Sequence, residues 1–244
     1  MSTATETSTI NLDPATSDIP RIEVPKPLTE KQVQEHIDNG FVIVPDVINR
    51  EEINEVVADM IKLLRGGYDC PSLQPLPESL SDEAVMNSFL GLLQPHYVSP
   101  VISRYVKHPL ICGMLSQLVA AHLPFWDGSV KCMQSMVFTK PPDYPGQAWH
   151  QDELYIPTRD HSLTGAWVAL DDATVENGCL YVIPQSHRMG YLYPQYPHER
   201  PGEWDFAPQS YGFDDSGAIP VEVKAGDVIF FNGYVLHCSF KNRS

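Results

Sequence analysis

The chain has 244 residues, which is enough for one large domain with a single hydrophobic core. Hydrophobic residues make up 43% of it, so a wholly disordered or fibrous protein is excluded. Acidic residues outnumber basic ones by 31 to 16, which gives a formal net charge of -15. The field of such a chain repels phosphate backbones and anionic membranes, and we therefore expect no nucleic-acid or membrane partner.

The five cysteines are scattered along the chain without a C-x-x-C spacing. This distribution argues against a disulfide framework and a cysteine zinc site, and it favours a reducing compartment. No apolar run approaches the ~20 residues of a membrane-spanning helix, and the Thr-rich and Ser-rich start has no basic segment followed by an apolar one. We expect a soluble, cytoplasmic protein.

The first half of the chain predicts a tail followed by helices. Residues 1–27 are polar, contain several prolines and show no hydrophobic period, which predicts a flexible tail. Two capping-box patterns, each with a Thr or Asn followed three residues later by Gln or Glu, predict helix starts. Helices are predicted from Thr29 to Asn39, from Asn49 to Gly66-Gly67 and from Pro109 onward, with a strand over 41–44.

From residue 129 the hydrophobic period changes from 3.6 to 2, which predicts short strands separated by turns. The predicted strands have the sequences SVKCMQSMVFTK, AWHQDELY, TGAWVALDD, GCLYVIP, VEVKA, GDVIFF and YVLHCSF. Strands that follow a block of helices predict a mainly β fold, an antiparallel double sheet with the N-terminal helices packed on one sheet. We expect one domain over 28–244, with its β core beginning at about residue 129.

Residues 188–219 interrupt this alternation with tyrosines, a tryptophan, prolines and charges. Long insertions without regular structure are often functional. We expect this aromatic insertion to form a wall or lid over the site, mobile until substrate binds.

The most informative motif is His150-Gln151-Asp152. On a strand, residues two apart share a face, so the imidazole and the carboxylate converge while Gln151 faces away. His237 on a late apolar strand is a plausible third ligand. Two imidazoles and one carboxylate form the facial triad typical of non-haem Fe(II), although this composition alone leaves zinc and manganese open.

The sequences around these residues resemble the phytanoyl-CoA dioxygenase family of Fe(II)/2-oxoglutarate-dependent oxygenases. The resemblance covers roughly residues 30–244 and is carried by WHQDELYIP, GAWVALDDATVENGCLYVIPQSHRMG and AGDVIFFNGYVLHCSFKNRS. It implies a double-stranded β-helix, also called a jelly roll, of the cupin-like kind. It also implies Fe(II), 2-oxoglutarate as co-substrate, and O2. The implied metal ligands and catalytic residues are His150, Asp152 and His237, and the implied cofactor-binding set adds Met136, Gln151, Trp167 and Ser239.

One feature of the family is not matched. Family members carry an arginine about ten residues beyond the distal histidine, where a planar guanidinium pairs with the far carboxylate of 2-oxoglutarate. Here the sequence ends at Ser244, and Arg243 is only a weak candidate for that residue. We expect the final strand and its arginine to lie beyond residue 244. Among the other histidines, His187 at the start of the aromatic insertion is the one that could face the cavity.

The leading hypothesis is a dioxygenase that hydroxylates or otherwise oxidises a C-H bond of a small organic metabolite and releases succinate and CO2. An intact Asp152 favours hydroxylation over halogenation, because related halogenases replace that carboxylate with a small residue. Two alternatives stay open: a cupin-like metal enzyme that does not use 2-oxoglutarate, and a non-catalytic ligand-binding protein that keeps the fold. The sequence leaves the substrate and the oligomeric state open.

Overall fold

The computed structural model describes residues 27–71, 73–123 and 128–244. The predicted tail therefore lies almost entirely outside the described residues. The helical segments are α1 Glu30–Asn39, α2 Arg50–Leu64, α3 Asp82–Met86, η1 Pro95–Tyr97, α4 Pro100–Tyr105, α5 Pro109–His122, η2 Asp152–Leu154 and η3 Ser186–Met189. The strands are β1 Phe41–Val44, β2 Gly91–Leu93, β3 Met136–Phe138, β4 Thr164–Val168, β5 Leu180–Val182, β6 Gln195–Tyr196, β7 Gln209–Ser210, β8 Ile219–Val221, β9 Val228–Asn232 and β10 His237–Ser239.

The two predicted capping boxes begin α1 and α2. The Thr29 hydroxyl accepts from the Gln32 amide while the Gln32 side chain accepts from the Thr29 amide. Asn49 and Glu52 form the same reciprocal pair at the start of α2. Each box satisfies amides that a helix leaves without an internal partner.

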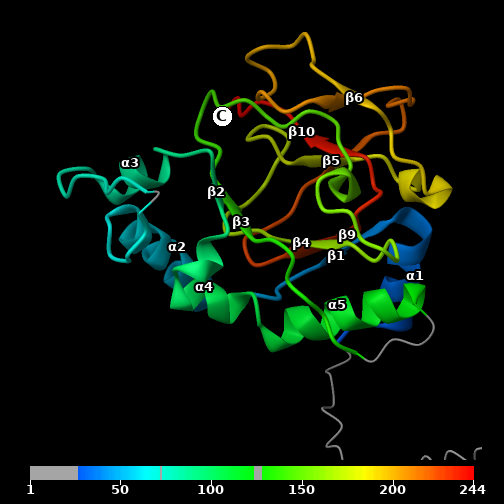
Figure 1. The fold of residues 1–244 in the computed structure, drawn as a ribbon, viewed down its shortest axis with the longest axis horizontal. Helices are drawn as coiled ribbons and strands as arrows, with labels where there is room; N and C mark the ends of the chain where they lie inside the picture. The colour runs from blue at the N-terminus through cyan, green and yellow to red at the C-terminus, as the bar shows by residue number, and fades with distance from the viewer. Residues whose placement is uncertain (1–26, 72, 124–127) are drawn as a thin grey trace, which may run out of the picture.

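Two three-stranded antiparallel sheets make up the centre of the fold. The first has the order β1-β9-β4 and the second has the order β10-β5-β8. Figure 1 shows them as two layers, with α5 below the first sheet. Their facing sides share one apolar cluster, in which Ile229 and Phe231 of the first sheet pack with Val182 and Val221 of the second. The two sheets therefore pack face to face.

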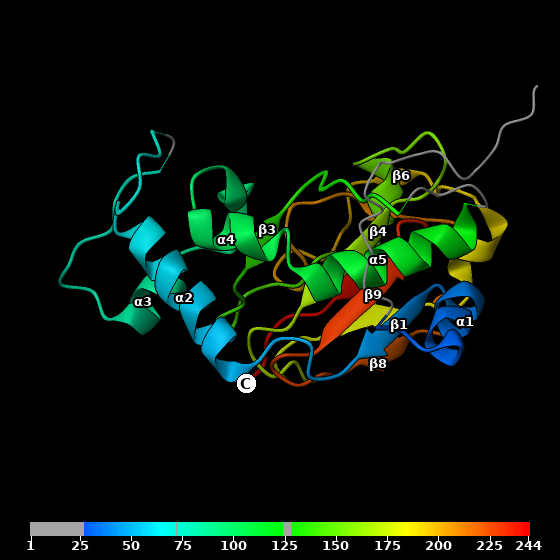
Figure 2. The same cartoon turned by 90° about the horizontal axis from the view of Figure 1, so that it is seen from below.

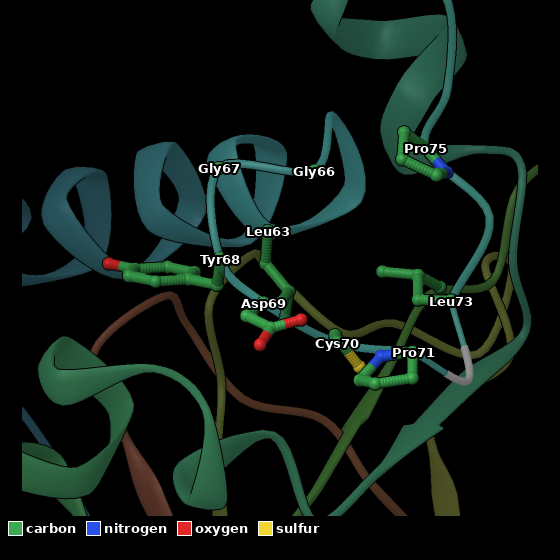
Figure 3. A pocket seen from close by; sticks show the side chains of 9 residues that line it. All are labelled: Leu63, Gly66, Gly67, Tyr68, Asp69, Cys70, Pro71, Leu73 and Pro75. Atoms are coloured by element: carbon green, nitrogen blue, oxygen red, sulfur yellow. The ribbon is translucent and has the colours of Figure 1, made fainter.

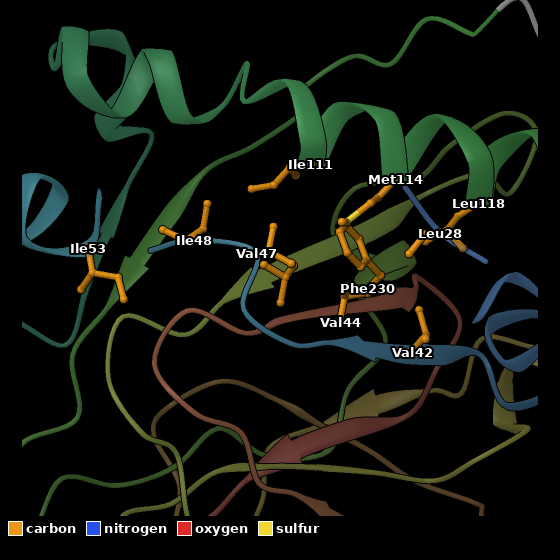
Figure 4. Close-up of a cluster of buried hydrophobic side chains, with 11 residues drawn as sticks. Leu28, Val42, Val44, Val47, Ile48, Ile53, Ile111, Met114, Leu118 and Phe230 are labelled. Atoms are coloured by element: carbon orange, nitrogen blue, oxygen red, sulfur yellow. The ribbon is translucent and has the colours of Figure 1, made fainter. Parts of the chain in front are cut away.

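Helix α5 covers the other side of the first sheet and α1 lies at its edge, whereas α2, α3 and α4 lie to one side (Figure 2). Ile111, Met114 and Leu118 of α5 belong to the same buried cluster as Phe230 of β9, and Met114 points toward Phe230 in Figure 4. Successive residues of β9 therefore contact the helix layer and the second sheet in turn, which explains why residues 228–231 are all buried. Antiparallel strands with helices on one face agree with the expected architecture, although the described chain is a mixture of helix and strand.

Several predicted boundaries were wrong. The strand expected over 129–140 is only three residues long, as β3. The strand expected over 148–155 is replaced by one isolated bridge at His150 and the 3-10 helix η2. The short helices α3 and α4 were not predicted, although Ser81 and Ser99 cap them. Such helices are too short to show a hydrophobic period.

The aromatic insertion contains a short antiparallel pair. In it β6 pairs with β7, and Trp204 is buried against Ala148 and Trp149. The insertion therefore packs against the segment that leads to His150.

Candidate metal centre

His150 and His237 are brought together by backbone pairing. The His150 amide donates to the His237 carbonyl (2.9 Å), and the His237 amide donates to the His150 carbonyl (3.1 Å). Residues paired in this way direct their side chains to the same face. The two ring centroids lie 4.1 Å apart, so the imidazoles converge.

Asp152 completes the group from the first position of η2. Its Oδ1 lies 3.6 Å from Nε2 of His150 and 3.7 Å from Nε2 of His237. The three ligand atoms lie within 4.8 Å of one another, and the three residues form a group that could hold a metal ion. The side chains of residues 150 and 152 converge, as predicted. They do so because the chain turns into a 3-10 helix at Asp152, and not because both residues lie on one continuous strand.

Both imidazoles are oriented by carbonyl groups of the backbone. Nδ1 of His150 lies 2.7 Å from the Ala148 carbonyl, and Nδ1 of His237 lies 3.0 Å from the Val235 carbonyl. A proton on each Nδ1 leaves the Nε2 lone pairs directed at Asp152. Burial, followed by the nearby His237, lowers the pKa of His150 to about 4, so this ring is neutral at physiological pH.

The carboxylate faces the more open side of the group. The Asp152 side chain is 30% exposed, whereas each histidine side chain is 6% exposed. Tyr155 stands beside it with its ring 6.0 Å from that of His150, and its hydroxyl accepts from the Gln195 side chain (2.9 Å). Two imidazole nitrogens and one carboxylate fit Fe(II) with adjacent open positions.

Gln151 points away from this group, as its place between the two ligands predicts. Its Nε2 donates to the carbonyls of Tyr191 (2.9 Å) and Tyr234 (2.8 Å), and its Oε1 accepts from the Tyr193 amide (2.9 Å). The residue is fully buried. Its hydrogen-bonding groups are therefore committed to the backbone, and this geometry favours a positioning role over direct contact with a cofactor.

The other expected cofactor-binding residues lie in different settings. Trp167 on β4 packs into the cluster between the two main sheets, which also contains Val235. Ser239 is buried on β10, two residues beyond His237. Met136 on β3 is 42% exposed and pairs through its backbone with Leu93 of β2.

Two weaker candidates are occupied elsewhere. The Arg243 guanidinium donates twice to the Glu203 carboxylate (2.7 Å each) and once to the Lys241 carbonyl (3.5 Å). His187 lies against α1, where its Nε2 contacts the Ile37 carbonyl (3.0 Å). This position does not support the expectation that His187 faces the cavity.

Sequence reasoning missed two charged residues near the site, of which Glu153 is buried and Lys140 is partly buried. Glu153 is 2% exposed, and its Oε1 accepts from both the amide and the hydroxyl of Thr158. Lys140 donates to the Ser239 hydroxyl. Lys140 follows Met136 at a two-residue period, a signal that could have placed it on the same face.

Figure 3 shows a separate cavity of about 460 Å³ at the C-terminal end of α2. It is lined by Leu63, Gly66, Gly67, Tyr68, Asp69, Cys70, Pro71, Leu73 and Pro75. None of the three converging ligands lines it, so the candidate chemistry lies elsewhere.

Comparison with known proteins agrees with this geometry. The family model for phytanoyl-CoA dioxygenase (PhyH) matches residues 37–244, which is most of the chain. The chain belongs to the phytanoyl-CoA dioxygenase family. All three converging ligands lie inside the region matched to this family.

Curated members of the phytanoyl-CoA dioxygenase family match parts of the chain. It is 38% identical to Phytanoyl-CoA dioxygenase 1 of Oryza sativa subsp. japonica over 113 residues, which is 46% of this chain and 40% of the rice protein. It is 24% identical to the protein called "Phytanoyl-CoA dioxygenase, peroxisomal" of Rattus norvegicus over 232 residues, which is 89% of this chain and 65% of the rat protein. The match thus spans about two fifths of the rice protein's length.

A solved structure shares the fold. The epimerase SnoN, crystallised with Fe3+, α-ketoglutarate and nogalamycin RO, superposes with a TM-score of 0.60 and 21% identity over 88% of this chain and 78% of that chain. That crystal structure contains an iron ion and a 2-oxo acid, the two groups that the family resemblance implies.

In the part of this chain that the structure describes, no helix is long and apolar enough to cross a membrane.

Proposed function

We propose that this protein is a non-haem Fe(II)/2-oxoglutarate-dependent dioxygenase. The observation that carries the proposal is the convergence of His150, Asp152 and His237 inside the region matched to the phytanoyl-CoA dioxygenase family. Carbonyl groups orient both imidazoles before any metal binds. A preformed donor set of this kind supports metal binding without a large rearrangement.

The roles of the residues follow from their positions. His150, Asp152 and His237 would hold the metal, and Trp167 would line the inner side of the co-substrate site. Fe(II) and 2-oxoglutarate held there would supply the oxygen-activating chemistry, with succinate and CO2 as products beside the oxidised substrate. Tyr193, a partly buried residue whose amide donates to Gln151, would help to exclude water from the site.

The proposed substrate is a small organic metabolite, and the proposed reaction is hydroxylation or another oxidation of a C-H bond. The intact Asp152 carboxylate supports hydroxylation over halogenation. The named relatives from rice and rat suggest an acyl-CoA instead. A formal charge of -15 disfavours such a multiply phosphorylated ligand.

Three further expectations belong to this proposal. The two main sheets would be the halves of a jelly roll, and residues 28–244 would belong to one domain. The proposed compartment is the cytoplasm, although the rat relative is called peroxisomal.

The proposal is tested by adding Fe(II) and 2-oxoglutarate to the protein without oxygen. We expect a weak visible charge-transfer band from chelation of the metal by the 2-oxo acid. Asp152→Ala should lose the band, because it removes the only carboxylate of the donor set. Glu35→Ala, which changes an exposed acidic residue of α1, should keep it.

The same experiment separates the alternatives. A protein that binds Fe(II) but gives no band with 2-oxoglutarate would be a cupin-like metal enzyme of another kind. A protein that gives the band but forms no succinate in air would be a ligand-binding protein. Equal bands in wild type and Asp152→Ala would contradict the assignment of the metal ligands.

A further inference from the structure

Glu153 directly follows the proposed metal ligand Asp152 and is one of the largest fully buried side chains of the described residues. It is 2% exposed, and no lysine, arginine or histidine in the described part of the chain forms an ion pair with it. Burying a carboxyl group costs free energy unless its oxygens are hydrogen-bonded. The contacts of Glu153 show what offsets this cost.

One carboxyl oxygen of Glu153 closes the loop that follows Asp152. Its Oε1 accepts from the Thr158 amide (2.5 Å) and from the Thr158 hydroxyl (2.6 Å). At the start of the same loop, the Asp152 carbonyl accepts from the amides of Tyr155 (2.9 Å) and Ile156 (3.0 Å). Hydrogen bonds near both ends of this loop therefore restrict its conformation.

The other carboxyl oxygen of Glu153 packs against the backbone at Gly233. Glu153 Oε2 is buried and makes no hydrogen bond within the described ranges. A Cβ at position 233 would lie 3.0 Å from this oxygen and 2.9 Å from Cβ of Leu163. Only glycine leaves room for so close an approach. The Glu153 amide also donates to the Gly233 carbonyl (3.0 Å), so the whole residue is held against this segment.

These contacts fix the backbone on both sides of Asp152. Before Asp152, His150 exchanges two backbone hydrogen bonds with His237. After Asp152, the Glu153 amide bonds to Gly233, four residues before His237. The segment that carries two of the proposed ligands is thus joined to the segment of the third at two points. The Glu153 side chain reinforces the second point by packing on Gly233.

We infer that Glu153 is a positioning residue, which fixes the Asp152 carboxylate where it meets the two imidazoles. This inference rests on the proposed function, in which Asp152 binds the metal. The Asp152 side chain is 30% exposed, compared with 6% for each histidine, so packing restrains it less. Its direction therefore depends on the loop that Glu153 closes. Groups that orient a ligand in this way contribute to metal affinity without touching the metal.

Cobalt(II) tests the inference, because its visible spectrum reports both binding and the ligands around the ion. The protein is titrated with Co(II) without oxygen, and the affinity and the band shape are recorded. Glu153→Ala should weaken Co(II) binding roughly 10- to 100-fold. Its band should shift toward that of Asp152→Ala, because the carboxylate is no longer held in place. Glu153→Gln keeps an oxygen for the two Thr158 donors and should recover most of the lost affinity.

Asp59→Ala is the matched control for a loss of stability. Asp59 is another buried carboxyl group, 6% exposed, and it accepts from the hydroxyls of Tyr68 and Ser99. Its loss should lower stability in urea denaturation and leave the Co(II) affinity and band of the folded protein unchanged.

Thr158→Ala removes one of the two donors to Glu153 and should weaken Co(II) binding by a smaller factor than Glu153→Ala. This variant replaces Glu153→Ala in the test if thermal unfolding shows that Glu153→Ala does not fold.

The outcomes distinguish two failures. If wild type does not bind Co(II), or if Asp152→Ala binds it as tightly as wild type, the proposed function is wrong. If Asp152→Ala weakens binding but Glu153→Ala and Thr158→Ala keep the wild-type affinity and band, Glu153 only stabilises the fold and the inference is overturned. It is also overturned if Glu153→Gln binds as weakly as Glu153→Ala, because charge and not position would then be responsible.

Discussion

A buried histidine in α1 gives the protein a pH-dependent stability at the scale of one residue. His36 is 7% exposed, and its Nε2 has no hydrogen-bond partner within the described part of the chain. Burial, followed by the charges of His187 and His122, lowers the pKa of His36 from 6.5 to about 4. Because the pKa in the folded state lies below that of the unfolded chain, the unfolded chain takes up the proton first. Stability from this group is complete above pH 6.5 and is lost as the pH falls toward 4.

We expect this histidine to account for a measurable part of acid destabilisation. Between pH 7 and pH 5, the free energy of unfolding of wild type should fall by about 2 kcal/mol more than that of His36→Leu. Urea denaturation at both pH values measures the difference. Between pH 8 and pH 7 the two proteins should differ by a constant amount. An equal fall in both proteins between pH 7 and pH 5 would show that His36 is not the group responsible.

At the same scale, the spacing of His150 and Asp152 predicts their convergence, but not the reason for it. His150 pairs with His237 in an isolated bridge, and Asp152, two residues later, is the first residue of η2. The prediction succeeded because both conformations direct residues 150 and 152 to one side. The contact between Lys140 and Ser239 could not be predicted, because 99 residues separate them and no local period links them.

At the scale of elements, local signals predict helix ends better than strands. The boxes at Thr29 and Asn49 are complete within four residues, and both are present in the structure. Strand lengths depend on partners from distant parts of the chain. β3 ends after three residues because only Gly91–Leu93 pairs with it, which a pattern within residues 129–140 cannot show.

Gln151 joins the aromatic segment to the metal centre, and this link can be measured. Gln151→Ala would remove three hydrogen bonds to the backbones of Tyr191, Tyr193 and Tyr234 and should lower the free energy of unfolding by about 2–4 kcal/mol. Amide hydrogen exchange should also increase in residues 191–193. Denaturation and exchange experiments test both effects.

Gln195→Ala is the matched control, since its side chain makes one exposed hydrogen bond to Tyr155. It should cost less than about 1 kcal/mol and leave exchange at residues 191–193 unchanged. Equal effects of the two substitutions on stability and on exchange would show that Gln151 does not position this segment.

At the scale of the whole molecule, the sequence motifs predict the family, and the family model confirms it over residues 37–244. The helix layer on one sheet could also be predicted, because α5 shows its apolar face in the sequence. The packing of the aromatic insertion could not, because Trp204 is buried by Ala148 and Trp149 and the local composition resembles a loop. Contacts of this kind are decided by the folded arrangement of distant segments.

Anomalous diffraction from crystals of the protein grown with Fe(II) under argon tests the metal centre most directly. One iron peak should lie between Nε2 of His150, Nε2 of His237 and a carboxylate oxygen of Asp152, at about 2.0–2.2 Å from each. An iron peak at other residues, or none at these three when the protein has bound iron in solution, would contradict the account.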